Sequence, residues 1–233
     1  MQLERILYSQ GFGSRKLCRI LCYDGRVAVN GEVCDDPTAN FATAGLQFSV
    51  DGEPWEFHEK AYLMLNKPAG YECSLKPQHH PGVHALLPAP LKERGVQTIG
   101  RLDEDTTGLL LFSDDGQFIH RMSSPKWKVP KVYRVTCKHA VDAQIAAVLK
   151  AGVQLNDEPA PIAALDCKVS GTHELRLTLG EGKYHQVKRM VAAAGNRVEA
   201  LERIAIGELL LPPDLPQRQW RWLTEEELKL FGF

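Results

Sequence analysis

The stretch GRLDEDTTGLLL, residues 100–111, decides how the rest of the sequence is interpreted. It joins a glycine turn to three consecutive acids, Asp103, Glu104 and Asp105, and then to an apolar run typical of a buried strand. The simplest interpretation of the acids alone is an exposed turn. Residues 105–108 (DTTG) are also close to the Asp-Thr-Gly of aspartic proteases. That chemistry needs two aspartates sharing a proton, whereas this sequence has an extra threonine and no second copy.

On either side of this stretch, short strands and helices alternate without a βαβ repeat. A regular alternation of leucines with polar residues predicts one of the strands. Gly152 and Gly195-Asn196 predict where two helices end. The patterns together predict the α+β class, with a central mixed, mostly antiparallel sheet. Strands are predicted at residues 61–66, 131–137 and 173–179, and helices at residues 142–151 and 184–194.

The first 60 residues form a separate pattern. Ser14 can cap a helix that packs Leu17, Ile20 and Leu21 on one side. Asn30-Gly31 then predicts a hairpin. The opposite side of the helix carries Arg15, Lys16 and Arg19.

A domain boundary is expected where Pro54 and a mixed polar run separate the two patterned regions. The predicted domains are residues 1–58 and 59–233.

The basic residues are clustered although the net charge is only −1. Residues 116–141 contain six Lys and Arg residues, no acid, and the interleaved aromatics Trp127 and Tyr133. Residues 182–198 contain four Lys and Arg residues and again no acid. Such clusters suit a phosphate backbone and an unstacked base. The alternative is that both are merely solvated surfaces.

The composition indicates neither a metal site nor a membrane protein. The six cysteines form no C-x-x-C pair, and the eight histidines have no metal-ligand spacing. No apolar run approaches the roughly 18 residues of a membrane span, and the N-terminus lacks the features of a signal peptide. We therefore expect a cytoplasmic protein.

Four motifs occur in an order that resembles the RsuA family of pseudouridine synthases. They are residues 65–71 (LNKPAGY), 100–111, 131–135 (KVYRV) and 180–190 (GEGKYHQVKRM). Residues 14–31 (SRKLCRILCYDGRVAVNG) resemble the S4 RNA-binding module. The usual acid after its Ser-Arg pair is absent, because Leu17 and Cys18 stand there. The resemblance covers nearly the whole chain.

The resemblance implies an S4 module followed by a pseudouridine synthase domain. The implied reaction is isomerisation of uridine to pseudouridine in 16S ribosomal RNA, with a target of the uridine 516 type. Alternatives are a 23S ribosomal RNA synthase, a non-catalytic RNA-binding assembly factor, or a hydrolase using Asp103 and Asp105 as an acid–base pair. The expected partner is ribosomal RNA within a small-subunit assembly intermediate. We expect a monomer and no contact with a membrane.

The resemblance also assigns roles to single residues. Asp103 is the expected nucleophile, with Lys188 as its counter-charge where many relatives carry arginine. Tyr133 is expected to lie against the uracil face and to relay a proton. Because the isomerisation neither oxidises nor transfers a group, no cofactor or metal is expected. RNA contacts are expected from Arg15, Lys16, Arg19, Arg26, Lys67, Lys183, Arg189 and Arg101, the last during base flipping.

Overall fold

The computed structural model describes residues 1–124 and 126–233, which divide into two compact units. The first unit comprises residues 1–61 together with residues 87–97. The second comprises residues 62–86 and 98–233. Both units contain helices and strands, so the predicted α+β class is confirmed. A single boundary after residue 58 stays a prediction, since the first unit is not one continuous segment.

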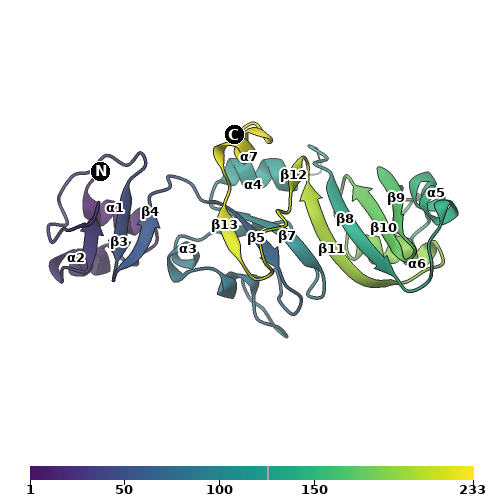
Figure 1. The fold of residues 1–233 in the computed structure, drawn as a ribbon, viewed down its shortest axis with the longest axis horizontal. Coiled ribbons are helices and arrows are strands. Elements are labelled where there is room, and N and C mark those ends of the chain that lie inside the picture. The colour runs from purple at the N-terminus through teal and green to yellow at the C-terminus, as the bar shows by residue number, and fades with distance from the viewer. Residues whose placement is uncertain (125) are drawn as a thin grey trace. The chain divides into compact units, whose positions relative to one another are not determined.

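The first unit is built on a four-stranded antiparallel sheet with the strand order β2-β1-β3-β4, of which β3 and β4 are labelled in Figure 1. The predicted turn at Asn30-Gly31 connects β1 to β2 and gives both residues a positive φ. The elements are α1 (Leu3–Ser9), α2 (Arg15–Tyr23), β1 (Val27–Val29), β2 (Glu32–Val33), β3 (Gln47–Val50), β4 (Glu53–Glu56) and α3 (Ala89–Glu93).

Helix α2 buries a different side from the one the sequence predicted. Ser14 caps it as expected, accepting a hydrogen bond from Leu17 N. However, Leu17 and Ile20 are exposed, whereas Cys18 and Cys22 join Leu21 in the core. Free cysteine behaves as a small apolar residue, and it allows α2 to approach α1 closely. The prediction of a buried Leu17 and Ile20 was therefore wrong.

Residues 87–97 are attached to the first unit through a buried amide. Gln10 is fully buried, and its Nε2 donates to the carbonyl of His58. Its Oε1 accepts from the backbone N–H of His58 and from Arg94 Nη1. Arg94 also donates to the carbonyls of His58 and Glu59. A Cβ on Gly11 would come within 2.0 Å of the Pro90 carbonyl oxygen, so this junction requires glycine.

The second unit is built on a nine-stranded sheet whose main path is β13-β5-β7-β11-β8-β10-β9 (Figure 1). Strands β6 and β12 pair with β7 and β11 outside that path. The strand elements are β5 (Tyr62–Lys67), β6 (Gln97–Ile99), β7 (Thr107–Ser113), β8 (Lys131–Cys137), β9 (Asp166–Gly171), β10 (Glu174–Leu179), β11 (Val198–Ile206), β12 (Leu209–Leu210) and β13 (Trp220–Trp222). The helices are η1 (Val83–Leu86), α4 (Gly116–Ser123), α5 (Ala143–Ala151), α6 (Gln186–Ala193) and α7 (Glu225–Lys229).

The sheet is mixed and mostly antiparallel, as predicted, and its parallel pair is β7 with β11. These two strands approach very closely. A Cβ on Gly108 would lie 2.3 Å from the carbonyl oxygen of Arg203. Gly108 also has a φ of 100°, so no other residue fits at this crossing.

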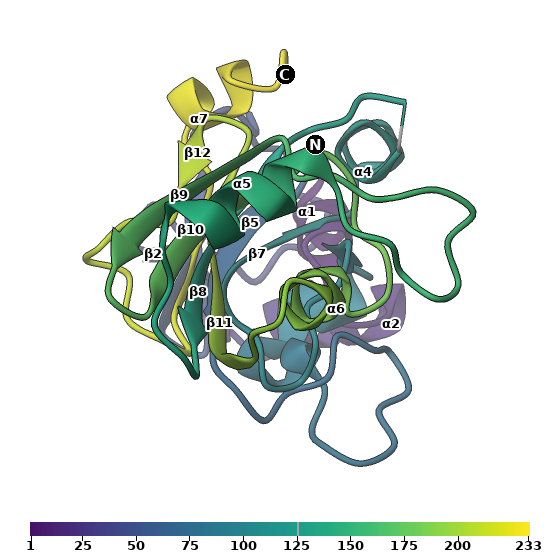
Figure 2. The same cartoon turned by 90° about the vertical axis from the view of Figure 1, so that its right-hand side faces the viewer.

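Helices cover the sheet at separate places. Helix α4 packs against β7, and its apolar side meets Phe231 near the C-terminus. Figure 2 shows α5 along β9 and α6 beside β11. Within residues 1–124 and 126–233, no helix has the length and apolar character needed to cross a membrane.

Candidate active site

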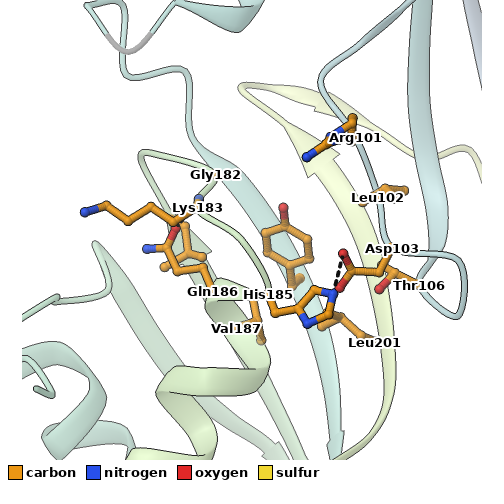
Figure 3. Close-up of a pocket in the computed structure, with 12 residues that line it drawn as sticks. Arg101, Leu102, Asp103, Thr106, Gly182, Lys183, His185, Gln186, Val187 and Leu201 are labelled. Atoms are coloured by element: carbon orange, nitrogen blue, oxygen red, sulfur yellow. Dashed lines mark hydrogen bonds and ion pairs between the residues drawn. The ribbon is translucent and has the colours of Figure 1, made fainter. Parts of the chain in front are cut away.

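Asp103 lies on the loop between β6 and β7 and faces a cavity (Figure 3). Its neighbour Leu102 is buried and anchors the loop against the domain. The N–H of Thr106 donates to the Asp103 carbonyl oxygen over 3.1 Å, which closes a tight turn. The turn leaves 29% of the Asp103 side chain exposed, so the carboxylate remains accessible to a ligand.

The side chain of Lys67 fixes the conformation of this turn through hydrogen bonds to its carbonyl oxygens. It is fully buried at the end of β5, and its Nζ donates to the carbonyl oxygens of Asp103, Glu104 and Thr106 over 3.0, 3.0 and 2.8 Å. Nζ also lies 3.0 Å from the carbonyl oxygen of Pro68, so its three N–H donors are shared among four acceptors. Burial lowers the pKa of Lys67, although nearby carboxylates oppose that effect. A buried cation thus fixes the backbone from which the Asp103 side chain projects.

Helix α6 supplies the counter-charge. Lys188 Nζ lies 3.2 Å from Asp103 Oδ2 and 2.7 and 2.9 Å from the two carboxylate oxygens of Asp105. Partial burial lowers the pKa of Lys188, but its hydrogen bonds and its attraction to both carboxylates raise it further, so the net shift is upward. Lys188 therefore stays charged between the two aspartates.

His185 gives Asp103 a second neighbour. It precedes α6 in the left-handed conformation, with φ of 45°, and its ring stacks on Tyr184 at 3.9 Å between centroids. The ring nitrogen Nε2 lies 3.4 Å from Asp103 Oδ1, and Figure 3 shows the two side chains pointing toward one another. A non-glycine residue held in this conformation is a feature of functional sites.

The cavity in front of Asp103 is lined by both apolar and polar groups. Tyr133 on β8 is 8% exposed and contributes one wall, while Leu179 and Leu201 contribute apolar surface. Arg101, which is exposed, stands at its edge. An apolar cavity with a few converging polar groups is suited to a flat, partly polar ring such as a nucleobase. Among the described residues, no three His, Cys, Asp or Glu side chains are grouped as metal ligands would be.

Comparison with known proteins agrees with this geometry. The family model described as RNA pseudouridylate synthase matches residues 61–193, a segment that contains Asp103, Tyr133 and Lys188. The model described as S4 domain matches residues 1–38. The chain belongs to the RNA pseudouridylate synthase family. It is a pseudouridine synthase with an N-terminal S4 domain.

Relatives of this pseudouridine synthase match it along its whole length. A protein of Yersinia pestis named ribosomal small subunit pseudouridine synthase A is 40% identical over 100% of this chain and 98% of its own. The protein YtzG of Bacillus subtilis, named an uncharacterized RNA pseudouridine synthase, is 37% identical over the same shares. A crystal structure described as pseudouridylate synthase is 32% identical, with a TM-score of 0.71 over 99% of both chains.

The synthase unit places its predicted RNA-binding residues in different environments. Arg101 is exposed at the cavity, and Lys183 lines the cavity while pairing with Glu158. Arg189 pairs with Asp157 and donates to the Tyr184 carbonyl, in a different hollow of the surface.

The remaining predicted contact in this unit, Lys67, needs correction. Its ammonium group is buried and bonded to four carbonyls, so it does not face RNA.

The four basic residues predicted to contact RNA in the S4 unit also differ in their ion pairs. Lys16 is exposed, and Arg15 is exposed beside the Tyr8 ring, 5.3 Å from its centroid. Arg19 is paired with Glu4, whose pKa is lowered chiefly by that hydrogen bond. Arg26 is bonded to both carboxylate oxygens of Asp51 over 2.6 Å. Arg15 and Lys16 are thus the more available of the four.

Two side chains of the site, Asp105 and His185, lie where the sequence did not predict their role. Asp105 was considered as half of a hydrolytic pair, whereas the structure uses it to hold Lys188. It is not among the described residues that line the cavity, which disfavours that hydrolytic pair. His185 sits inside the quoted motif at residues 180–190. The signal that could have found it is a ring-bearing residue at the start of a helix in a glycine-rich motif.

Proposed function

We propose that this enzyme isomerises a uridine of 16S ribosomal RNA, with Asp103 as the nucleophile. The observation that carries the proposal is the Asp103 carboxylate, which faces a cavity lined by Tyr133 and lies 3.2 Å from the Lys188 ammonium group. The ammonium group compensates the negative charge of the Asp103 carboxylate. That charge is what a carboxylate needs in order to attack a nucleoside.

The reaction is balanced within the substrate. The N1–C1′ bond breaks, the uracil turns, and a C5–C1′ bond forms. The proton that leaves C5 is replaced by one gained at N1, so no external oxidant or group donor takes part. Asp103 attacks the nucleoside to allow the glycosidic bond to break. Lys188 compensates its charge while that bond is open, with Asp105 holding the lysine in place.

Further side chains complete the proposed mechanism. Tyr133 presents a nearly buried phenol to the cavity, where it packs against the face of the uracil and relays the C5 proton. Arg101 is exposed at the rim and suits the task of filling the stack from which the base is flipped. His185 lies beside Asp103 Oδ1 while Lys188 lies beside Oδ2, so the two neighbours together limit how far the carboxylate can rotate.

The choice of small-subunit RNA is supported by the relatives' names, since several carry the words ribosomal small subunit pseudouridine synthase A. We include in the proposal the uridine 516 target that the resemblance implies. The enzyme is proposed to act as a cytoplasmic monomer on an assembly intermediate, before ribosomal proteins cover the target. The S4 module then supplies a second contact with the same RNA.

Pseudouridine mapping tests this proposal. Total ribosomal RNA is compared between cells with the gene, cells without it, and cells that carry the Asp103→Asn variant. We expect one 16S uridine to be modified only with the wild-type gene. A modification confined to 23S RNA would contradict the substrate assignment. A wild-type pattern with the Asp103→Asn variant would contradict the role of Asp103.

The same variant separates chemistry from folding. Asparagine nearly conserves the shape of Asp103, so purified Asp103→Asn protein should bind 16S RNA with an affinity close to that of wild type. Its single-turnover rate should fall by at least about four orders of magnitude, as for the removal of other catalytic nucleophiles. If binding were lost together with activity, misfolding would explain the result, and circular dichroism of the variant would show it.

A further inference from the structure

A second cavity adjoins the one in front of Asp103. Arg101, Tyr133 and Gly182 line both, so the two cavities share a wall. The second continues toward Lys131, Arg203 and Ser123, the last residue of α4. Three cations therefore line it, and no acid is found among its described lining residues.

Arg203 is the buried member of this group. It is 3% exposed on β11, and its Nε donates to the carbonyl oxygen of Leu109 over 2.8 Å. Its Nη2 is buried without a hydrogen-bond partner among the described residues. A buried guanidinium donor without an acceptor is costly, so its retention calls for a ligand that supplies one. The cross-strand pairing of Arg203 with Tyr133 places it directly beside the cavity wall that both cavities share.

Lys131 reinforces the positive charge. It begins β8, is partly buried, and forms no ion pair within the described part of the chain. Burial and the charge of Arg203 both lower its pKa, in that order of size. Two neighbouring cations without an intervening acid repel each other. An anion between them would relieve the repulsion and accept from both.

We propose that this second cavity, named here the Arg203 cavity, binds a phosphodiester group of the RNA strand next to the nucleotide being isomerised. The proposal rests on the proposed function, because it assumes that the uridine base enters the cavity in front of Asp103. A base and its phosphates are separated by one ribose, and the two cavities are separated by one shared wall. Arg203 and Lys131 would then bind the RNA backbone equally well before and during the reaction, so they would contribute to affinity and not to the rate of the chemical step.

An anion-binding measurement tests the cavity without using the reaction. Inorganic phosphate is titrated against thermal unfolding at constant ionic strength, for wild type, Lys131→Met, Arg203→Lys and Lys138→Met. Arg203→Lys keeps the charge but loses the Nη2 donor. Lys138→Met removes an exposed lysine just after the same strand and serves as the matched control. We expect the phosphate dissociation constant to rise at least tenfold in Lys131→Met and in Arg203→Lys. It should stay at the wild-type value in Lys138→Met. Equal dissociation constants in all four proteins would overturn the proposal.

A second measurement decides whether the anion is a free phosphate or the RNA backbone. Single methylphosphonate linkages, which lack the negative charge, are placed on either side of the modified uridine in a 16S RNA fragment. One linkage should weaken binding to wild type about tenfold and weaken binding to Lys131→Met clearly less, because that variant has lost one of the cations that the phosphate charge attracts. Equal weakening of both proteins, or none, would show that the cavity does not hold the RNA backbone.

Turnover of the unmodified fragment by wild type is measured alongside. Absence of pseudouridine there would contradict the proposed function, whereas the phosphate titration would still report on the Arg203 cavity. At saturating RNA, the single-turnover rate of Lys131→Met should change less than about threefold while its KM rises about tenfold. A tenfold fall in the single-turnover rate with no change in KM would overturn the assignment of Lys131 to backbone binding.

Discussion

The S4 unit keeps its basic side chains at the surface, whereas the synthase unit buries two of them, Lys67 beneath the Asp103 turn and Arg203 at the second cavity. Arg15 and Lys16 are exposed, but Lys67 is 0% and Arg203 3% exposed. Surface cations attract phosphates through water, so their contributions are small, additive and screened by salt. Buried cations are held by specific acceptors, and their loss leaves those acceptors unpaired. Lysine and arginine thus contribute to RNA affinity in the S4 unit, whereas in the synthase unit the buried ones fix the positions of neighbouring groups.

The largest effect should come from Lys67→Met. The variant keeps the volume of the side chain but removes the ammonium donor from the carbonyls of Pro68, Asp103, Glu104 and Thr106. Of these, Asp103 and Glu104 keep one backbone donor each, the N–H groups of Thr106 and Gly70. We expect the free energy of unfolding to fall by about 3–5 kcal/mol. Urea unfolding followed by tryptophan fluorescence measures it. With Lys138→Met as the surface control, a shift of about 0.5 kcal/mol or less is expected. Equal shifts for both variants would break the contrast between buried and surface lysines.

Lys188→Met should affect activity more than stability. Removing this cation leaves Asp103 and Asp105 without their counter-charge and takes away the hydrogen bonds that lower the pKa of Asp105. We expect the single-turnover rate at neutral pH to fall about 10²- to 10³-fold, and the acidic limb of the pH–rate profile to move to higher pH. Lys188→Arg should restore most of the rate. A profile unchanged in shape and height would show that another cation faces Asp103.

Asp105→Asn should have a smaller effect, because Asp105 positions Lys188 without facing the cavity. Losing two ionic hydrogen bonds frees the lysine, and we expect kcat to fall roughly tenfold with little change in KM. A fall in kcat of the size seen for Asp103→Asn would instead make Asp105 a catalytic residue.

The stability difference between wild type and Asp105→Asn should depend on pH. Burial raises the pKa of Asp105, but its bonds to Lys188 lower it further, so the folded pKa lies below the usual value. A lowered carboxyl pKa contributes stability above the ordinary aspartate pKa of about 3.9, and this is lost as pH falls through the lowered value. The difference in stability between wild type and Asp105→Asn should therefore shrink below about pH 4. A constant difference from pH 7 to pH 2 would contradict the pairing with Lys188.

The smallest effects should come from the S4 unit, where they appear in the salt dependence of RNA binding. Replacing Arg15, Lys16 and Arg19 together by alanine should reduce the log–log slope, by about 0.7 to 0.9 for each phosphate that is no longer neutralised. Because Arg19 is paired with Glu4, the double variant at Arg15 and Lys16 should account for most of the change. The rate at saturating RNA should stay within about twofold of wild type. Identical slopes for wild type and the triple variant would remove the docking role of this surface.

Elements with a regular local pattern could be predicted from the sequence. Leu175, Leu177 and Leu179 alternate along β10 and are buried as the alternation requires. Helix α5 begins after Asp142, whose side chain caps it, and ends at Gly152. These features depend on residues close in sequence, so the sequence contains the information that determines them.

The errors fell where the outcome depends on distant partners. Lys67 follows an apolar strand and precedes a proline turn, which normally indicates an exposed cation. Its acceptors lie up to 39 residues further along the chain, and nothing near Lys67 signals them. Asp105 and Lys188 are 83 residues apart, and their pairing follows from the packing of α6 beside β11. Arg203 also stands among apolar residues in a strand, where a charged residue normally indicates a solvent-exposed position, yet it is buried.

The attachment of residues 87–97 to the first unit has a consequence for synthesis on the ribosome. Gln10 finds its partner Arg94 only after the strand β5 and the loop beyond it have been made. The first unit therefore stays incomplete while residues 62–97 emerge from the exit tunnel. At about 5–20 residues per second, that delay is roughly 2–7 s. During this interval the nascent chain exposes Gln10 and the backbone around Gly11, and the two units begin to fold in overlapping periods rather than one after the other.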